Sequence, residues 1–326
     1  MTELNIGIVG GGYMGKRHAV AFAAVGAVFE TTLRPRLAMV AASSQASAER
    51  YRAAFGFAQA TGDWRALVAD PGVDAVIIAS PQDTHEDIAC AAFAAGKHVL
   101  CEKPLSTSLA SSTRMAEAAR ASGVIHMSGF NYIRTPASQQ ARRMIARGDL
   151  GQITHFRGEH TEDFLADPDL PANWRTDGRA NGTMGDLAPH MVNAAMALIG
   201  PIAEVMADIE TVHKTRSGVD VSNDDQGHML CRFESGVMGH LHFSRVATGR
   251  KMGYIYEVTG TQGALRFDQE DQNALWFYDA SHPPETQGFR KILTGPAHPD
   301  YAPFCVGPGH GTGYQDQIII QARDFL

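Results

Sequence analysis

The first fifteen residues contain the feature that most restricts the fold of this chain. An apolar segment at residues 4–9 runs directly into a turn with the spacing G-x-G-x-x-G, and residues 16–24 follow as an alanine-rich helical run. In such a turn Gly10 allows a tight bend, Gly12 lets the backbone approach a pyrophosphate, and Gly15 lets the helix pack closely on the strand. The amides at the start of that helix favour an anion. The sequence therefore predicts a dinucleotide-binding strand–turn–helix unit.

Composition excludes several other classes of function. The chain has 326 residues, enough for two domains, and 44% of them are hydrophobic. Its formal net charge of −7 provides no basic field for nucleic acid or for an anionic membrane surface. No apolar run is long enough to span a bilayer, and the N-terminal residues lack a signal sequence, so we expect a cytoplasmic protein.

Side chains that commonly bind metals show no recognisable framework. The cysteines have no C-x-x-C spacing, which favours reduced, mostly buried thiols over disulfides or a zinc site. His240 and His242 alternate on a predicted strand, but without an acidic neighbour we expect them to face solvent or an interface. We therefore expect no metal. The four cysteines are Cys90, Cys101, Cys231 and Cys305.

The first 130 residues alternate between predicted strands and predicted helices. Continuous apolar strands separated by helices of about ten residues indicate a parallel sheet that is covered on both faces. We therefore expect a doubly wound α/β domain, a Rossmann fold, over residues 1–130 that binds a dinucleotide. After the first strand, the predicted strands are residues 36–42, 74–80, 98–101 and 125–129, and the predicted helices are residues 47–55, 83–95 and 109–121.

From residue 152 the pattern changes to alternating apolar and polar residues with few helices. Such segments form antiparallel strands with one face against a core. We therefore expect residues 131–326 to form a substrate-binding α+β domain around a large, mostly antiparallel open sheet. Because this sheet leaves a face to cover, we also expect a homodimer or homotetramer that uses it. The predicted strands are residues 153–159, 204–213, 228–233, 237–246, 254–259, 264–267 and 274–278.

Lys103 is the first candidate for chemistry. It follows the predicted strand at residues 98–101, and ligands of doubly wound sheets lie beyond the carboxyl ends of the strands. Pro104 restricts the preceding lysine to an extended conformation, which orients its side chain. The alternative is an ordinary exposed lysine in a loop.

Asp186 and His190 are the second candidate. Four residues apart, they would share one face of a helix, where a carboxylate raises the basicity of an imidazole. A histidine in that state suits general acid–base catalysis near neutral pH. In the alternative, Asp186 caps the helix, Pro189 lies in its first turn, and His190 is a packed or solvated residue.

Two loops complete the set of candidates. The loop at residues 164–182 is rich in Asp, Pro and Asn and carries Trp174 and Arg175, which favours a functional loop over a disordered linker. The glycine-rich segment at residues 307–313 lacks the Gly-Lys-Ser/Thr ending of a P-loop, so we expect a flexible loop that borders the active site.

Taken together, these motifs resemble the glucose-fructose oxidoreductase, inositol dehydrogenase and MocA (Gfo/Idh/MocA) family of nicotinamide-dependent dehydrogenases. The resemblance covers nearly the whole chain, and its strength lies in the order and spacing of the motifs. Besides the glycine-rich start, they are ASPQDTH at residues 79–85, EKP at 102–104, GFNY at 129–132 and GTMGDLAPH at 182–190.

The resemblance implies a catalytic pair, Lys103 and His190, with Asp186 orienting the substrate or the histidine. In oxidation, His190 or Lys103 would take the hydroxyl proton while a hydride passes to the nicotinamide, and the charge of Lys103 would stabilise the developing alkoxide. We favour His190 as the base because its unperturbed pKa is about 6.5. The candidate cofactor-binding residues are Gly10, Gly12, Tyr13, Met14, Gly15, Ser43, Ser44, Ser80, Pro81, His85, Glu102, Lys103 and Asn131. The candidate substrate-binding residues are Lys103, Trp174, Arg175, Asp186 and His190.

Three features depart from the family pattern. The second predicted strand ends in Ser43 and Ser44 with no acidic residue for the adenosine ribose, so NAD and NADP both remain open. Asn193 replaces an aspartate that often follows the family's histidine, which puts substrate contacts there in doubt. The chain stops inside a helix predicted from near Gln315 and is shorter than typical members, so either a C-terminal segment is missing or the fold is completed differently.

The expected function is therefore an NAD(P)-dependent dehydrogenase of a sugar, a sugar acid or a cyclitol. The polar and aromatic residues of segment 160–175 suit a polyhydroxylated ligand, as in members that act on levoglucosan or inositols. One alternative is reduction of a non-sugar carbonyl or double bond, as in dihydrodiol dehydrogenase or biliverdin reductase. Another is a cofactor-sensing regulator without catalysis, against which the joint presence of Lys103, Asp186 and His190 argues.

Overall fold

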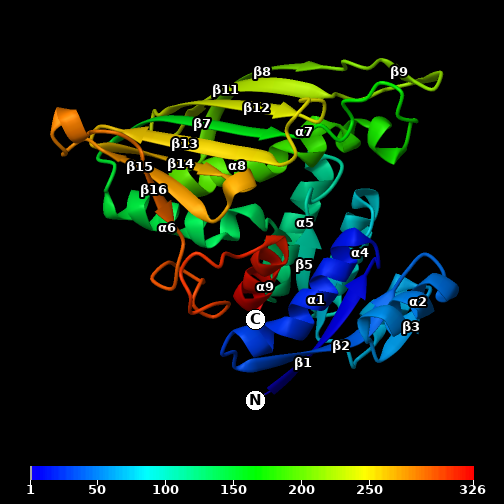
Figure 1. Cartoon of the computed structure of the whole chain (residues 1–326). Coiled ribbons are helices and arrows are strands. Elements are labelled where there is room, and N and C mark those ends of the chain that lie inside the picture. The colour runs from blue at the N-terminus through cyan, green and yellow to red at the C-terminus, as the bar shows by residue number, and fades with distance from the viewer. Residues whose placement is uncertain (1) are drawn as a thin grey trace. The chain divides into compact units, whose positions relative to one another are not determined.

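The computed structural model describes residues 2–326, apart from the side chain of Arg179, and the chain divides into two compact units. The first unit comprises residues 2–134 together with 313–326, and the second comprises residues 135–312. Figure 1 colours both units by position along the chain. Within residues 2–326, no helix combines the length and the apolar character needed to cross a membrane.

Six parallel strands form the sheet of the first unit, in the order β3-β2-β1-β4-β5-β6. Every residue of β4 is buried, as expected for a central strand that is covered on both faces. The predicted doubly wound sheet is thus confirmed, although the short strand β3 was not predicted. The strands are β1 (Thr2–Val9), β2 (Leu33–Ala41), β3 (Gln59–Thr61), β4 (Ala75–Ile78), β5 (His98–Glu102) and β6 (His126–Gly129).

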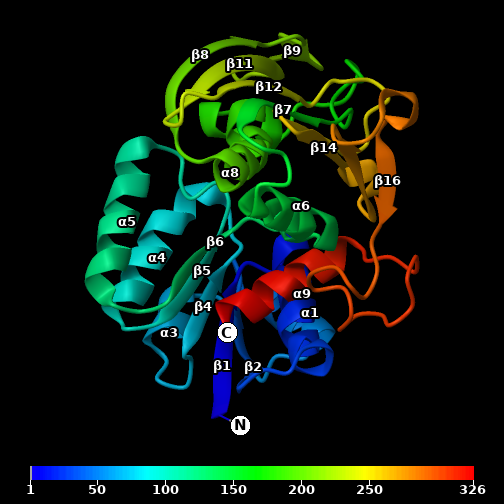
Figure 2. The same ribbon diagram turned by 90° about the vertical axis from the view of Figure 1, so that its left-hand side faces the viewer.

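Helices cover both faces of this sheet (Figure 2). One apolar cluster joins α3, α4 and α5 to the strands and includes Leu67, Ile88 and Met115. Gly56 ends α2 in the left-handed conformation, which fits the predicted stop of that helix. The helices of this unit are α1 (Tyr13–Val28), α2 (Gln45–Phe55), α3 (Trp64–Ala69), η1 (Gln82–Thr84), α4 (His85–Ala94), α5 (Leu109–Ser122), η2 (Tyr132–Arg134) and α9 (Tyr314–Phe325).

The C-terminal helix α9 packs in the first unit, which differs from the expected boundary at residue 130. That boundary places the helix in the second domain, whereas α9 lies against α1. Phe325 meets Phe22 edge-on with ring centroids 6.1 Å apart, and Gln317 accepts a hydrogen bond of 3.1 Å from the buried side chain of Asn131. The apolar period of a helix shows which of its residues are buried, but it does not show on which sheet the helix packs.

Eight strands form the sheet of the second unit, in the order β16-β15-β14-β13-β7-β12-β11-β8. The pairs are antiparallel except for β12 with β7, which run parallel, so the mostly antiparallel sheet is confirmed. Strands β9, β10 and β16 were not predicted. The strands are β7 (Ile153–Thr161), β8 (Ile202–Glu210), β9 (Thr215–Arg216), β10 (Val219–Asp220), β11 (Gln226–Phe233), β12 (Met238–Ser244), β13 (Gly253–Gly260), β14 (Gly263–Asp268), β15 (Ala274–Asp279) and β16 (Arg290–Leu293).

Helices α6 and α8 cover the same face of this sheet, as both views show (Figures 1 and 2). A hydrogen bond of 3.0 Å from the hydroxyl of buried Tyr256 in β13 to Ser138 in α6 links the two layers. The helices of the second unit are α6 (Pro136–Arg147), η3 (Trp174–Thr176), η4 (Arg179–Asn181), α7 (Thr183–Asp186), α8 (Ala188–Ile199), η5 (Gln269–Asp271) and η6 (Pro284–Thr286).

The opposite face, which we call the outer face, carries a cluster of three histidines, His228, His240 and His242. The rings of the cross-strand partners His228 and His242 stack with centroids 4.3 Å apart, and Nδ1 of His228 lies 3.5 Å from Nε2 of His240. Glu159 lies 3.8 Å from Nδ1 of His242, so these histidines have the acidic neighbour that the sequence analysis did not expect. Desolvation, and after it the charge of neighbouring histidines, lowers the pKa of His228 and of His240.

We predict that the histidine cluster makes stability fall with acid. The folded chain lowers the pKa of His228 and His240 below the unfolded value of about 6.5, so the unfolded chain binds more protons just below that pH. The free energy of unfolding should therefore be fully retained above about pH 6.5 and fall as the pH drops towards the lowered folded pKa. The measurement is the melting temperature as a function of pH for the native chain and for His228→Gln, whose pH dependence should be flatter.

The matched control for that prediction is His126→Gln, which changes an exposed histidine of the first unit. Its melting curve should follow the native pH dependence. An unchanged slope in His228→Gln would show that the cluster does not cause the acid sensitivity.

Candidate active site

The glycine-rich turn has the geometry of a phosphate cradle. Gly10 has a φ of +99°, and a Cβ there would overlap the carbonyl of Ala79 at the end of β4. A Cβ at Gly15 would overlap the carbonyl oxygen of Gly10, whereas no atom lies within 4 Å of the Cβ position of Gly12. The three glycines therefore occupy the tight turn, the close helix–strand contact and the open approach that the sequence predicts.

The start of α1 leaves its amides available to an anion. Its N-cap is Gly12, which has no capping side chain, and its first turn contains no acidic residue. A dinucleotide pyrophosphate fits this cradle, and the structure adds a constraint that the sequence did not show. A Cβ at Gly11 would overlap the ring of Tyr51 from α2, so Gly11 is needed to let that helix approach.

Tyr13 and Met14 contact the C-terminal helix. The ring of Tyr13, which is 62% exposed, stacks on Tyr314 with centroids 6.2 Å apart, and the Arg17 guanidinium lies 4.9 Å from the Tyr13 ring. The Tyr314 hydroxyl is 3.6 Å from the sulfur of Met14. An aromatic and cationic group therefore flanks the phosphate cradle.

The end of β2 presents hydroxyl groups. Ser43 follows the strand, and Ser44 caps α2 by accepting a hydrogen bond of 3.2 Å from the amide of Ser47. Arg50 donates a hydrogen bond of 3.0 Å to the hydroxyl of Ser47. Residues 42–48 include no carboxylate, so nothing in this stretch repels a ribose 2′-phosphate.

Lys103 is held by a buried carboxylate. Glu102 accepts a hydrogen bond of 3.2 Å from the Lys103 amide, and its other oxygen lies 2.7 Å from Nε2 of buried His18 in α1. A Cβ at Gly129, at the end of β6, would lie 2.8 Å from this carboxylate. The peptide bond between Lys103 and Pro104 is cis. Lys103 is thus fixed at the carboxyl edge of the sheet, where the sequence predicts it.

His85 joins the loops that follow β4 and β5. Its buried ring lies 3.0 Å from the carbonyl of Ser80 and 3.1 Å from the carbonyl of Pro104. Pro81 precedes the short helix η1 in the first of these loops. Ser80, Pro81, His85, Glu102 and Lys103 therefore come together at one edge of the first sheet, and Asn131 follows β6 at that edge.

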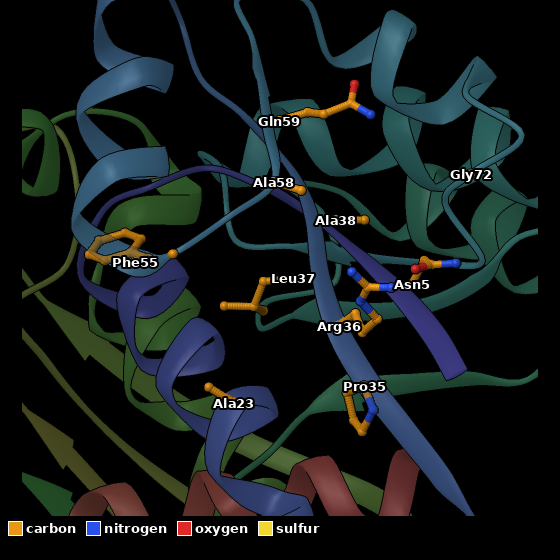
Figure 3. A pocket seen from close by; sticks show the side chains of 11 residues that line it. Asn5, Ala23, Pro35, Arg36, Leu37, Ala38, Phe55, Ala58, Gln59 and Gly72 are labelled. Atoms are coloured by element: carbon orange, nitrogen blue, oxygen red, sulfur yellow. The ribbon is translucent and has the colours of Figure 1, made fainter. Parts of the chain in front are cut away.

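A pocket of about 540 Å³ lies elsewhere in the first unit (Figure 3). Asn5, Pro35 and Gln59, from the first halves of β1 and β2 and the start of β3, are among its lining residues. The glycine-rich turn follows the carboxyl end of β1, so this pocket is not the predicted dinucleotide site.

The second unit separates Asp186 from His190 by a break in the helix. The single helix expected here is wrong, because α7 ends at Asp186 and α8 begins at Ala188. Pro189 lacks the amide that would bond to the carbonyl of Gly185 in a continuous helix. Pro189 does lie in the first turn of α8, but the N-cap is Leu187, so Asp186 does not cap that helix.

Trp174, Arg175 and Asp186 nevertheless come together. Nε of Arg175 lies 3.7 Å from a carboxylate oxygen of Asp186, and its guanidinium lies 4.2 Å from the ring of Trp174. Trp174 is 60% exposed. The predicted loop and the end of α7 therefore present a cation, a carboxylate and an apolar ring face as one group.

His190 is buried beside a second histidine. Its ring centroid lies 5.5 Å from that of His160 in β7, and only 5% of His190 is exposed. Nδ1 of His160 lies 3.0 Å from the carbonyl of Leu187, and Nε2 lies 3.1 Å from Glu162. The sequence placed His160 in a segment suited to a ligand, whereas the structure buries it under the break between α7 and α8.

A buried ion pair that the sequence analysis missed supports this loop. Arg245 donates hydrogen bonds of 3.0 Å to Asp225 and 2.7 Å to Asn223, and both ion-pair partners are buried. The same guanidinium donates to the carbonyls of Arg175, at 2.7 Å, and Asn181, at 3.1 Å. The backbone carbonyl of Arg175, whose side chain contacts Asp186, is therefore bound by the guanidinium of this buried ion pair. The sequence shows Arg245 only as an arginine on a predicted strand, which does not reveal that it is buried in an ion pair.

Comparison with known proteins decides the family. Residues 4–130 match an oxidoreductase family with an NAD-binding Rossmann fold, and residues 138–266 match the GFO/IDH/MocA C-terminal domain. The chain belongs to the GFO/IDH/MocA family. The resemblance stated from the motifs is thus confirmed, and the protein is an oxidoreductase that uses NAD(P).

Relatives of this GFO/IDH/MocA protein match it over its full length. Levoglucosan dehydrogenase of Pseudarthrobacter phenanthrenivorans is 37% identical over 348 residues, which cover 100% of this chain and 89% of the relative. A structure of levoglucosan dehydrogenase in complex with NADH and levoglucosan has a TM-score of 0.96 at 37% identity, covering 99% and 89% of the two chains. An NAD binding oxidoreductase from Klebsiella pneumoniae has a TM-score of 0.94 at 42% identity, covering 99% and 88%.

We predict that alanine at two glycines of the cradle weakens cofactor binding in both cases but lowers stability in only one. Gly15→Ala should lower the stability by about 1–3 kcal/mol and abolish binding of reduced cofactor, because its Cβ meets backbone. Gly12→Ala should melt like the native chain but bind reduced cofactor more weakly, because its Cβ occupies only the open approach. Thermal melting and a fluorescence titration with NADH and NADPH measure both effects. Equal cofactor affinity in Gly12→Ala and the native chain would contradict the assignment.

We predict that loss of the buried guanidinium is costly. Arg245→Met leaves Asp225 buried without its partner and should lower the free energy of unfolding by about 3–5 kcal/mol. Arg250→Met is the matched control, because Arg250 pairs with Glu159 and Glu270 in a more exposed setting, and it should cost roughly 0–1 kcal/mol. Urea unfolding of the two variants compares them directly, and similar losses would refute the structural role given to Arg245.

Proposed function

We propose that this GFO/IDH/MocA protein transfers a hydride between NAD or NADP and a hydroxyl-bearing carbon of a sugar, an anhydrosugar or a cyclitol. The observation that carries the proposal is the group formed by Trp174, Arg175 and Asp186. A carboxylate accepts and a guanidinium donates hydrogen bonds to neighbouring hydroxyls, while an exposed indole packs on the C–H face of a ring. Levoglucosan dehydrogenase, a relative along the full chain, supports this class of substrate.

We assign separate roles to the two units. The first unit binds the dinucleotide through the glycine-rich turn and presents Lys103, and the second unit binds the substrate. The nicotinamide, when bound, supplies the hydride chemistry. The Lys103 ammonium stabilises negative charge on the reacting oxygen, and Glu102 fixes its backbone. His190 takes or returns the hydroxyl proton, and Asp186 orients the substrate.

The burial of His190 suits a proton carrier at the reacting oxygen. Its ring lies against His160, whose own ring is fixed between Leu187 and Glu162. A base whose orientation is fixed by packing needs little reorganisation when it meets a hydroxyl. This favours His190 over Lys103 as the base, since a lysine needs a much larger pKa shift to act near neutral pH.

We also propose self-association through the outer face of the second sheet. Strand β8 is exposed along nearly its whole length, and Met206, Leu230 and Met238 are exposed apolar side chains on the outer face of β8, β11 and β12. A homodimer or homotetramer would cover them. A cytoplasmic location is part of the same proposal and is supported by the free state of all four cysteines.

The test is turnover with a panel of monosaccharides, anhydrosugars, inositols and sugar acids, with NAD and NADP in parallel, followed by nicotinamide absorbance. We expect turnover with one of these classes. Lys103→Met and His190→Asn should each lower kcat by at least about a hundredfold while the affinity for reduced cofactor stays nearly intact. His190→Asn should also remove the acidic limb of the pH–rate profile, because the base is then lost.

The control variant is Lys214→Met, which removes an exposed lysine of the second unit and should leave turnover unchanged. Silence across the whole panel, from a chain that still binds reduced cofactor, would overturn the proposed substrate class. It would favour a non-sugar carbonyl or a regulator. A variant of Lys103 that retains most of its activity would overturn the role of that residue.

A further inference from the structure

A second reactive group lies in the second unit, outside the residues assigned to hydride transfer. The sulfur of Cys305 lies 3.1 Å from Nδ1 of His310 and accepts a hydrogen bond of 3.3 Å from the amide of Gly307. Cys305 is half-buried and His310 is exposed, so the pair lies at the surface of the second unit. The thiol sulfur of Cys305 thus contacts both a base, the His310 ring, and a backbone amide donor.

The surrounding loop is shaped to hold this pair together. A Cβ at Gly307 would lie 2.8 Å from Cε1 of His310, so only glycine lets the ring lie over the backbone at this point. Gly309 and Gly311 have φ values of +79° and +80°, which turn the chain back toward the cysteine. The glycine-rich loop at residues 307–313 therefore holds His310 beside Cys305.

Tyr301 links the two ends of the loop through hydrogen bonds. Its ring is fully buried, and its hydroxyl donates a hydrogen bond of 3.0 Å to the carbonyl of Gly307 and accepts one of 2.9 Å from the amide of Gly311. Asn273 holds the end of the loop by accepting a hydrogen bond of 2.7 Å from the amide of Thr312. The positions of Cys305 and His310 are thus set by the buried core of the unit and not only by their closeness in sequence.

The other cysteines lack such surroundings. Cys101 and Cys231 are buried, and Cys90 is half-buried, so the expectation of mostly buried thiols holds for two of the four. Desolvation raises the pKa of the Cys90, Cys101 and Cys231 thiols, which disfavours their reactive thiolate forms. Selective chemistry at Cys305 is therefore expected.

We propose that Cys305 is a thiol–disulfide exchange site for low-molecular-weight disulfides, with His310 as its base. His310 accepts the thiol proton, and the amide of Gly307 stabilises the thiolate. The thiolate attacks one sulfur of the disulfide, a new S–S bond forms to Cys305, and the other half leaves as a thiolate that takes up a proton. The protein sulfur is oxidised and the leaving sulfur is reduced, so no further oxidant is needed.

The test uses the full chain and glutathione disulfide as the probe, with intact-mass measurement and peptide mapping. We expect one adduct, on Cys305, and none in Cys305→Ser. His310→Gln should slow its formation by at least about tenfold near neutral pH and change the pH dependence of the rate. Gly307→Val, which keeps both reactive side chains but displaces the ring, should slow it similarly.

The matched control is His282→Gln, which alters another exposed histidine of the second unit and should leave the rate unchanged. Thermal melting confirms that each variant is folded. Adducts spread over several cysteines, or an unchanged rate in folded His310→Gln, would overturn the proposal. Neither outcome depends on turnover of a sugar, so this test is independent of the proposed function.

Discussion

One buried carboxylate organises the carboxyl edge of the first sheet. Glu102 contacts His18 of α1, accepts from the amide of Lys103 and occupies the space that Gly129 leaves open at the end of β6. A buried carboxylate is costly unless its oxygens are satisfied, so these contacts must form together. The position of Lys103 is therefore a consequence of how three elements pack, and it does not depend on the lysine side chain itself.

The sequence predicted the elements of the fold better than their arrangement. The alternation of buried strands and helices predicts the parallel sheet, and the period of two predicts the second sheet, because both patterns are local. The docking of α9 on α1 was not predicted, since the chosen partner of an apolar helix face depends on long-range packing. The break between α7 and α8 could have been foreseen, because Pro189 cannot donate to the carbonyl of Gly185.

The candidate residues of the first unit and those of the second unit differ in how far the sequence predicts their positions. The glycine-rich turn and Lys103 lie at fixed positions after strands, so motif spacing locates them. The setting of Arg175 is long-range: its carbonyl is held by Arg245, seventy positions along the chain, together with Asp225 and Asn223. No local pattern distinguishes that arginine from an exposed one. The loop holding Cys305 and His310 likewise depends on the distant Asn273.

The position of α9 makes the first unit discontinuous in the chain. On the ribosome, residues 2–134 emerge first, yet Phe22 and Tyr13 gain their partners Phe325 and Tyr314 only after the entire second unit has been made. During that interval an apolar strip on α1 lacks this cover and is available to chaperones or to other nascent chains. The first unit is thus the first part of the chain to be synthesised, yet its packing is completed only after the second unit has been made.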